Sequence, residues 1–158
     1  MKYLETAVVF REVPNEVTLA INISGCQIRC KDCHSKYLWE DKGEELSVEV
    51  LSSLIINNSG ISCVCFMGGD HCFSELKFLC KEIKHKFPKL KVAWYSGKQS
   101  LTNTSILEYL DYIKLGPYNK EFGPLDSPHT NQRFYEVIHT PSSNLLSDIT
   151  SLFNNKKR

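Results

Sequence analysis

The chain has no long apolar segment that would place it in a membrane. Its 158 residues contain no stretch of about 18 consecutive apolar residues, the length that marks a membrane-spanning helix. The first twenty residues also contain no apolar run long enough for the core of a signal peptide. We therefore expect a cytoplasmic protein that has no membrane partner.

The chain also has no excess of charge of either sign. Its 19 lysines and arginines balance 18 acidic residues, which leaves a net charge of +1. Nucleic-acid-binding proteins usually carry a basic patch or stripe, so the sequence predicts no nucleic-acid partner. Internal repeats, low-complexity tracts and linkers are absent as well. With 42% hydrophobic residues to form a core, we expect one domain over residues 1–158.

Cysteine, in contrast, is plentiful, and three of the seven cysteines lie close together. Cys26, Cys30 and Cys33 have C-x3-C-x2-C spacing directly after a strand-like run, residues 17–23. Without an export signal, such thiols are better interpreted as metal ligands than as a disulfide framework. A structural zinc or a fully ligated iron-sulfur cluster normally takes four protein ligands. A group of three therefore implies either a missing ligand or an open coordination position.

Hydrophobic periodicity and turn residues predict strands that alternate with helices. We expect strands at residues 17–23, 61–67, 90–95, 112–115 and 134–138. We expect helices after Ser47, between Asp70 and Pro88, at residues 106–110, and from Thr140-Pro141 up to a solvated tail at 154–158.

Alternating strands and helices indicate an α/β fold built from βα repeats on a mainly parallel sheet. A closed eight-stranded barrel usually needs about 250 residues, so we expect a partial, open (βα) barrel. Ligands bind such sheets at the carboxyl ends of the strands. Four turns would gather there: the cysteine loop, Gly68-Gly69-Asp70, Ser96-Gly97 and Gly116-Pro117.

The cysteine spacing after a strand, followed by a Gly-Gly-acid turn after the next strand, resembles the radical S-adenosylmethionine (radical SAM) superfamily. The resemblance implies that Cys26, Cys30 and Cys33 hold three irons of a 4Fe-4S cluster, and that S-adenosylmethionine chelates the fourth. An electron from the cluster then breaks the sulfonium C–S bond, giving methionine and a 5′-deoxyadenosyl radical that removes a hydrogen atom from the substrate. No catalytic residue beyond the cluster ligands is required.

The same resemblance implies which residues contact the cofactor. The Gly68-Gly69-Asp70 turn would hold the methionine end, because glycines let backbone carbonyl groups approach the ammonium closely. The other expected contacts are Asp32, Cys33 and His34 beside the adenine, then Tyr95, Ser96, Gly97 and Gly116.

Several residues keep two interpretations. Asp70 either contacts the cofactor or caps the helix that follows, and Lys114 meets either the cofactor carboxylate or solvent. His34 either orients a group in the site or lies partly exposed beside it. Cys72 is a buried thiol or a redox group. The remaining cysteines are predicted to be core residues: Cys63, Cys65 and Cys80.

Within the superfamily, five blocks resemble the activating proteins of anaerobic ribonucleoside-triphosphate reductases in the same order. They are residues 33–34, 67–70, 94–97, 115–118 and 131–133. This resemblance implies a protein substrate: a glycine Cα–H in a C-terminal loop of the reductase, converted to a stored glycyl radical. It also implies a flavodoxin- or ferredoxin-like electron donor.

Three alternatives stay open at this point. The chain could activate another glycyl radical enzyme, such as one resembling pyruvate formate-lyase, or act on a small molecule. It could instead be a zinc-binding interaction module with His34 as the fourth ligand. Adjacent Cys33 and His34 ligands give poor tetrahedral geometry, and zinc would leave the Gly68-Gly69-Asp70 turn unexplained.

Overall fold

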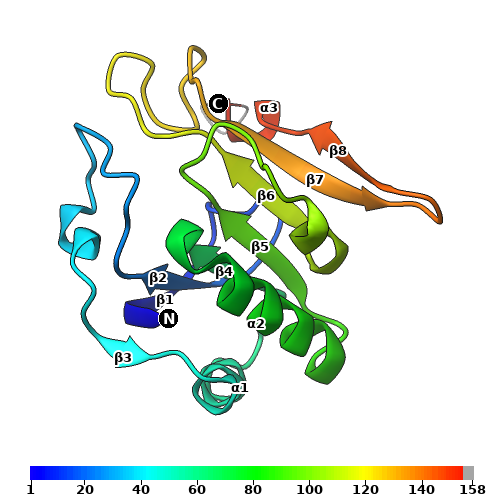
Figure 1. Cartoon of the computed structure of the whole chain (residues 1–158). Helices are drawn as coiled ribbons and strands as arrows, with labels where there is room; N and C mark the ends of the chain where they lie inside the picture. The colour runs from blue at the N-terminus through cyan, green and yellow to red at the C-terminus, as the bar shows by residue number, and fades with distance from the viewer. Residues whose placement is uncertain (155–158) are drawn as a thin grey trace.

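Four parallel strands form the centre of the molecule, and antiparallel strands extend the sheet on both sides (Figure 1). This computed structural model describes residues 1–154. Its eight-stranded sheet has the order β3-β1-β2-β4-β5-β6-β7-β8 and is not closed into a barrel. The parallel strands are β2 (Thr18–Ile23), β4 (Cys63–Met67), β5 (Lys91–Tyr95) and β6 (Tyr112–Leu115). The antiparallel strands are β1 (Lys2–Val9), β3 (Glu44–Glu45), β7 (Arg133–His139) and β8 (Asn144–Asp148).

The helices follow the predicted order through most of the chain. They are α1 (Val48–Asn57), α2 (Phe73–Lys86) and α3 (Ser151–Asn154), with 3-10 turns at η1 (Lys36–Trp39), η2 (Asp70–Cys72) and η3 (Ser105–Tyr109). Ser47 caps α1 by accepting the Val50 N–H at 3.2 Å. Within the described residues, no helix is long and apolar enough to cross a membrane.

The two faces of the sheet carry separate apolar clusters. Figure 1 shows α1 and α2 on one face, where Phe66 and Trp94 are fully buried beneath the helices. Side chains alternate along a strand, so Cys65 and Ala93 point to the opposite face. The chain between β1 and β2 covers that face with the fully buried Val13. His34, which directly follows Cys33, lines a cavity on this second face with Tyr95 and Leu125.

Two parts of the sequence prediction need correction. The sheet is mixed rather than mainly parallel. The strands β1 and β3, which the sequence did not predict, pair antiparallel, and β7 and β8 form an antiparallel hairpin. The helix expected from Thr140-Pro141 is wrong, since Thr140 and Ser143 close the hairpin turn with an N–H to carbonyl bond of 2.9 Å. Leu145 and Leu146 then pair with β7. Of the tail predicted at 154–158, Asn154 is the last residue of α3, and residues 155–158 lie outside the described residues.

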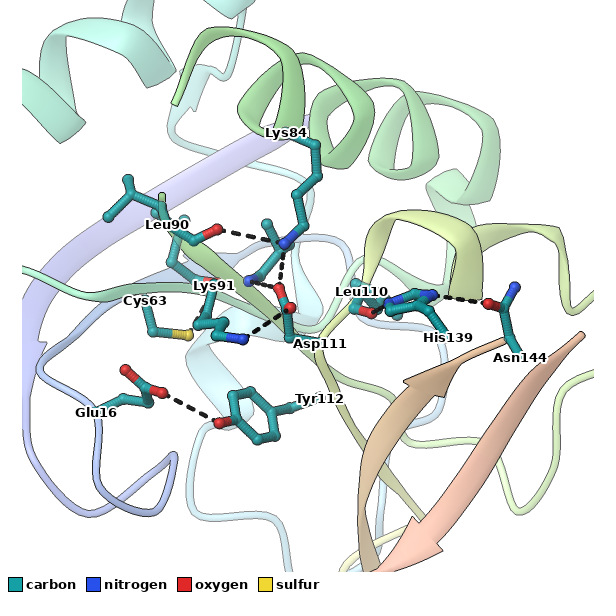
Figure 2. A network of polar contacts seen from close by, with 12 residues as sticks. Glu16, Cys63, Lys84, Leu90, Lys91, Leu110, Asp111, Tyr112, His139 and Asn144 are labelled. Carbon is teal, nitrogen blue, oxygen red and sulfur yellow. Dashed lines mark hydrogen bonds and ion pairs between the residues drawn. The ribbon is translucent and has the colours of Figure 1, made fainter. Parts of the chain in front are cut away.

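A polar network ties the amino ends of the central strands together (Figure 2). The Asp111 carboxylate, before β6, accepts the Val92 N–H at 2.8 Å and forms ion pairs with Lys84 from α2 and with Lys91. Nearby, the Tyr112 hydroxyl donates to the Glu16 carboxylate at 3.1 Å. These contacts fix α2 and β6 to β5 at the amino ends of the strands, and the cysteine loop lies at the carboxyl ends.

Candidate functional site

The cysteine loop leaves the carboxyl end of β2 and folds back on itself. Cys26 donates its N–H to the Leu38 carbonyl at 2.9 Å, and Cys33 donates to the Cys30 carbonyl at 3.1 Å. Arg29 has a left-handed backbone (φ 49°), which turns the chain between the first two thiols. Cys26, Cys30 and Cys33 are all free and half-buried, so a bound group can reach them from solvent.

The sulfur of Cys33 has a donor of its own. The Ser35 backbone N–H points to Cys33 Sγ at 3.3 Å. Such N–H to sulfur bonds stabilise thiolate ligands and tune the iron-sulfur clusters that they hold. The loop therefore supplies one such hydrogen bond at Cys33.

The positions of these side chains do not form a single-ion site. In residues 1–154, no three His, Cys, Asp or Glu side chains converge as the ligands of one metal ion do. Tetrahedral zinc requires sulfur atoms about 2.3 Å from one ion. His34, the fourth ligand of the zinc alternative, instead packs on the Tyr118 ring at 4.8 Å. A four-iron cluster is larger, and three thiolates that each bind a different iron need not converge on one point. His34 is thus not placed as a fourth zinc ligand, and the three thiols are a donor set that an iron-sulfur cluster uses.

The two glycines after β4 have the backbone that the sequence suggested. Gly68 and Gly69 both adopt positive φ values, 102° and 91°, which side chains other than glycine rarely tolerate. The buried indole of Trp94 donates to the Gly68 carbonyl at 2.8 Å, and Cys72 donates its N–H to the Gly69 carbonyl at 3.0 Å. Each carbonyl keeps a second lone pair for a ligand.

Asp70 joins the ends of two neighbouring strands. Its carboxylate accepts the Ser96 hydroxyl and, at 3.0 Å, the Gly97 N–H. The structure shows no side-chain cap by Asp70 on the following turn or on α2. The helix-capping interpretation is therefore wrong, and Asp70 holds the turns after β4 and β5 together.

The turn after β5 contacts both the cysteine loop and the turn after β6. A Cβ atom at Gly97 would lie 2.8 Å from Ile28, which sits between Cys26 and Cys30, so only glycine fits. Lys98 accepts the Gly116 N–H at 2.7 Å through its carbonyl. The four turns predicted to gather at the carboxyl ends of the strands are therefore in contact.

Lys114 is a buried cation inside this group of turns. Only 7% of it is exposed, its ammonium donates to the Gly116 carbonyl at 2.8 Å, and it lies over the Tyr95 ring at 5.5 Å. Burial lowers the pKa of Lys114 to about 8, although the negative charges of Asp70, Cys30 and Cys26 oppose this. Lys114 therefore faces the site and not solvent.

The ammonium of Lys114 has donors to spare. A lysine has three N–H groups, and within residues 1–154 the Gly116 carbonyl is the acceptor that the structure shows. Asp70, the carboxylate whose charge acts on Lys114, is already bonded to Ser96 and Gly97. Lys114 thus has two N–H groups available to an anionic ligand.

Two expected contacts on the cysteine loop have a weaker structural basis. Asp32 is half-buried, and its side chain makes no hydrogen bond or ion pair within the described part of the chain. His34 is exposed and lines a cavity of about 520 Å³ on the second face of the sheet. The cavity is also lined by Arg11, Glu12, Tyr95, Leu125 and Phe153.

Sequence reasoning missed Arg11, Glu12 and Ile28 as neighbours of the site. Arg11 and Glu12 follow the unpredicted strand β1, and the Tyr95 hydroxyl donates to the Glu12 carbonyl. The β-branched residues Thr6, Val8 and Val9 were the signal that could have located this strand. Ile28 carried no comparable signal, because its contact with Gly97 is purely tertiary.

The cysteines outside the loop have a different environment. Cys63, Cys65 and Cys80 are fully buried, and burial raises their pKa values well above the ordinary thiol range. Their assignment to the core is confirmed. Cys72 is half-buried, and desolvation raises its pKa as well, so it is the less reactive neutral thiol.

Three thiols on a strand-end loop are a donor set of iron-sulfur proteins, and comparison with known families agrees. The profile of the 4Fe-4S single cluster domain matches residues 16–134, which include Cys26, Cys30 and Cys33. The chain therefore belongs to this family, an iron-sulfur domain found in radical SAM-type proteins. Comparisons with curated proteins and with solved structures found no match.

Proposed function

We propose that this protein is a radical SAM activating enzyme that generates a glycyl radical on an anaerobic ribonucleoside-triphosphate reductase. The observation that carries the proposal is that the cysteine loop packs on the turn after β5, which is bonded to Asp70 after β4 and to Gly116 beside the buried Lys114. When bound, the cluster and S-adenosylmethionine supply a carbon-centred radical that takes a hydrogen atom from the substrate.

Each part of the site has a role in this proposal. Cys26, Cys30 and Cys33 hold three irons and leave the fourth open to the cofactor. The Gly68-Gly69 turn faces the methionyl ammonium with carbonyl lone pairs that remain free. Lys114 donates to the methionyl carboxylate, because its ammonium is buried beside the cysteine loop with unused N–H groups.

Several residues position these groups rather than bind directly. Asp70 fixes Ser96 and Gly97, and Gly97 lets Ile28 and the cysteine loop lie against β5. Gly116 accepts Lys114 through its carbonyl and so aims the ammonium. We assign the adenine to the backbone of residues 32–34 and to Tyr95.

The cavity beside His34 provides space for the substrate segment. Its volume of about 520 Å³ lies on the same face of the sheet as Lys114 and Tyr95, and it adjoins the cysteine loop. A glycine-containing loop of the reductase would enter here and bring its Cα–H to the cofactor. The reaction would run in a reducing cytoplasm with a flavodoxin- or ferredoxin-like donor.

The first test is anaerobic reconstitution followed by measurement of iron, sulfide and 5′-deoxyadenosine. The wild-type chain should bind four irons and cleave S-adenosylmethionine after reduction, whereas Cys30→Ala should lose cleavage. Cys72→Ala is the matched control, since Cys72 is also half-buried but lies outside the loop, and it should remain active. Zinc without iron, or normal cleavage by Cys30→Ala, would contradict the proposal.

The substrate needs a separate measurement. Mixing the reconstituted enzyme with the anaerobic reductase should give a glycyl-radical signal by electron paramagnetic resonance. Cofactor cleavage with no such signal would retain the radical SAM chemistry but reject the reductase as substrate. The same assay with a pyruvate formate-lyase-like protein then tests the alternative.

A further inference from the structure

The two edges of the sheet differ in how they are protected. β3 ends one edge with two exposed glutamates, Glu44 and Glu45, and a short acidic strand discourages pairing with another chain. β8 ends the other edge with five residues that include no proline or lysine. Figure 1 shows β7 and β8 as an arm that extends beyond the rest of the sheet. Its one charged residue, Asp148, forms an ion pair with Arg133 of β7 at 3.7 Å, so the β8 edge is less protected against association than the β3 edge.

The arm carries exposed apolar side chains on both faces. Ile138 and Leu145 are paired across the two strands and are 40% and 55% exposed. Leu146, opposite the buried Val137, is on the other face and is 39% exposed. Exposed leucines on a sheet edge are a typical feature of strands that pair with another chain.

The backbone groups on the outer side of β8 are available as well. Ile149 donates its N–H to the Phe134 carbonyl at 2.9 Å, which fixes the alternation of the antiparallel ladder. Leu145 and Ser147 then direct their backbone groups to β7, whereas Asn144, Leu146 and Asp148 direct theirs away from the sheet. Among residues 1–154, no strand pairs with this outer side.

We propose that β8 pairs with β8 of a second copy of this chain, antiparallel across a two-fold axis at Leu146. In this register each Leu146 meets its counterpart, and each Asn144 lies opposite an Asp148. No like charges face each other, and the asparagine amide can donate to the aspartate carboxylate. A strand that is complementary to itself in this way suits a closed, isologous dimer. The proposal does not rest on the enzymatic function.

Sedimentation velocity of the full chain tests the proposal. Between about 1 and 100 µM, the wild-type protein should shift from monomer to dimer. Leu146→Arg places two cations at the axis and should weaken the dimer at least about tenfold. Leu146→Pro removes an outward N–H while leaving the bonds to β7, and it should act in the same direction.

Ile56→Arg is the matched control, because Ile56 is 68% exposed on α1, away from the arm. It should dimerise like the wild type, and far-ultraviolet circular dichroism should show all variants folded. A wild-type chain that stays monomeric at about 100 µM would overturn the proposal. So would a dimer that survives both Leu146 substitutions, since another surface would then form it.

Discussion

At the scale of single residues, Lys114 is the position where function and stability oppose each other. Burying an ammonium with one carbonyl acceptor costs folding free energy, and the lowered pKa of about 8 records that cost. An anionic ligand on the free N–H groups would recover it. A buried charge that the fold alone does not need is the expected signature of a binding residue.

We predict that Lys114→Met stabilises the cluster-free protein at pH 7 by on the order of 1–3 kcal/mol. The pKa of Lys114 is lower in the folded state than in the unfolded state. The charged lysine therefore lowers the free energy of unfolding by the full amount below about pH 8, and this loss disappears as the pH rises toward 10.5. Urea unfolding at pH 7 and pH 9.5 checks this. The difference between variant and wild type should shrink at the higher pH. An equal difference at both values would show that Lys114 is not the titrating group.

The same substitution should weaken binding of S-adenosylmethionine to the reconstituted protein by about tenfold or more, the loss expected for a charge-assisted hydrogen bond. Wild-type affinity should also fall as the pH rises past about 8, because the neutral amine no longer attracts a carboxylate. Isothermal titration calorimetry at several pH values measures both effects. A Lys114→Met variant with wild-type affinity would remove the lysine from the site.

At the scale of elements, the site depends on close contact between turns that follow different strands. Asp70 links the turns after β4 and β5, and Gly97 lies against Ile28 of the cysteine loop. Gly116 connects to the turn after β5 through the Lys98 carbonyl. Parallel strands place all their carboxyl ends at one edge, which is why turns distant in the sequence meet.

We predict that Gly97→Ala displaces the cysteine loop and lowers iron retention, while the sheet stays folded. The new Cβ would lie 2.8 Å from Ile28, and overpacking of this kind costs about 1–3 kcal/mol. Iron content after reconstitution and desalting is the measurement. The double variant Gly97→Ala/Ile28→Ala removes the clash and should recover much of the iron. No recovery would mean that the glycine acts by some route other than this contact.

At the scale of the whole molecule, the candidate site and the stabilising polar network lie at opposite ends of the central strands. The carboxyl ends carry the candidate site, and the amino ends carry the Asp111 network with Lys84 and Lys91 (Figure 2). Asp111 is the centre of that network, because it also accepts the Val92 N–H. The site can therefore vary without loss of the contacts that fix α2 to the sheet.

We predict that Asp111→Asn lowers the free energy of unfolding by about 1–3 kcal/mol, since Lys84 and Lys91 lose their charged partner. The folded variant should bind iron and S-adenosylmethionine as the wild type does. Urea unfolding and calorimetry measure the two quantities. Weaker cofactor binding with an unchanged free energy of unfolding would contradict the separation of the site from the stabilising network.

Much of the fold was accessible from the sequence because its signals are local. The strands near residues 17–23, 61–67, 90–95 and 112–115 and the helix capped by Ser47 follow from side-chain period and turn residues. β3 was missed because it has only two residues, β1 because its polar and apolar residues do not alternate, and β8 because its leucines were assigned to a helix. Leu145 and Leu146 fit a helix or a strand equally well, and the hairpin turn at Thr140 decided between them.

The sequence by itself determined the donor chemistry of this protein. Cys26, Cys30 and Cys33 share one loop, so their spacing indicates a three-thiolate metal site, and the family match identifies it as an iron-sulfur site. Only the tertiary structure decided that Asp70 joins two turns, that Ile28 packs on Gly97, and that Lys114 faces inward. The physical reason is that ligand spacing is written along the chain, whereas burial and the contacts between turns arise only when separate strands pack side by side.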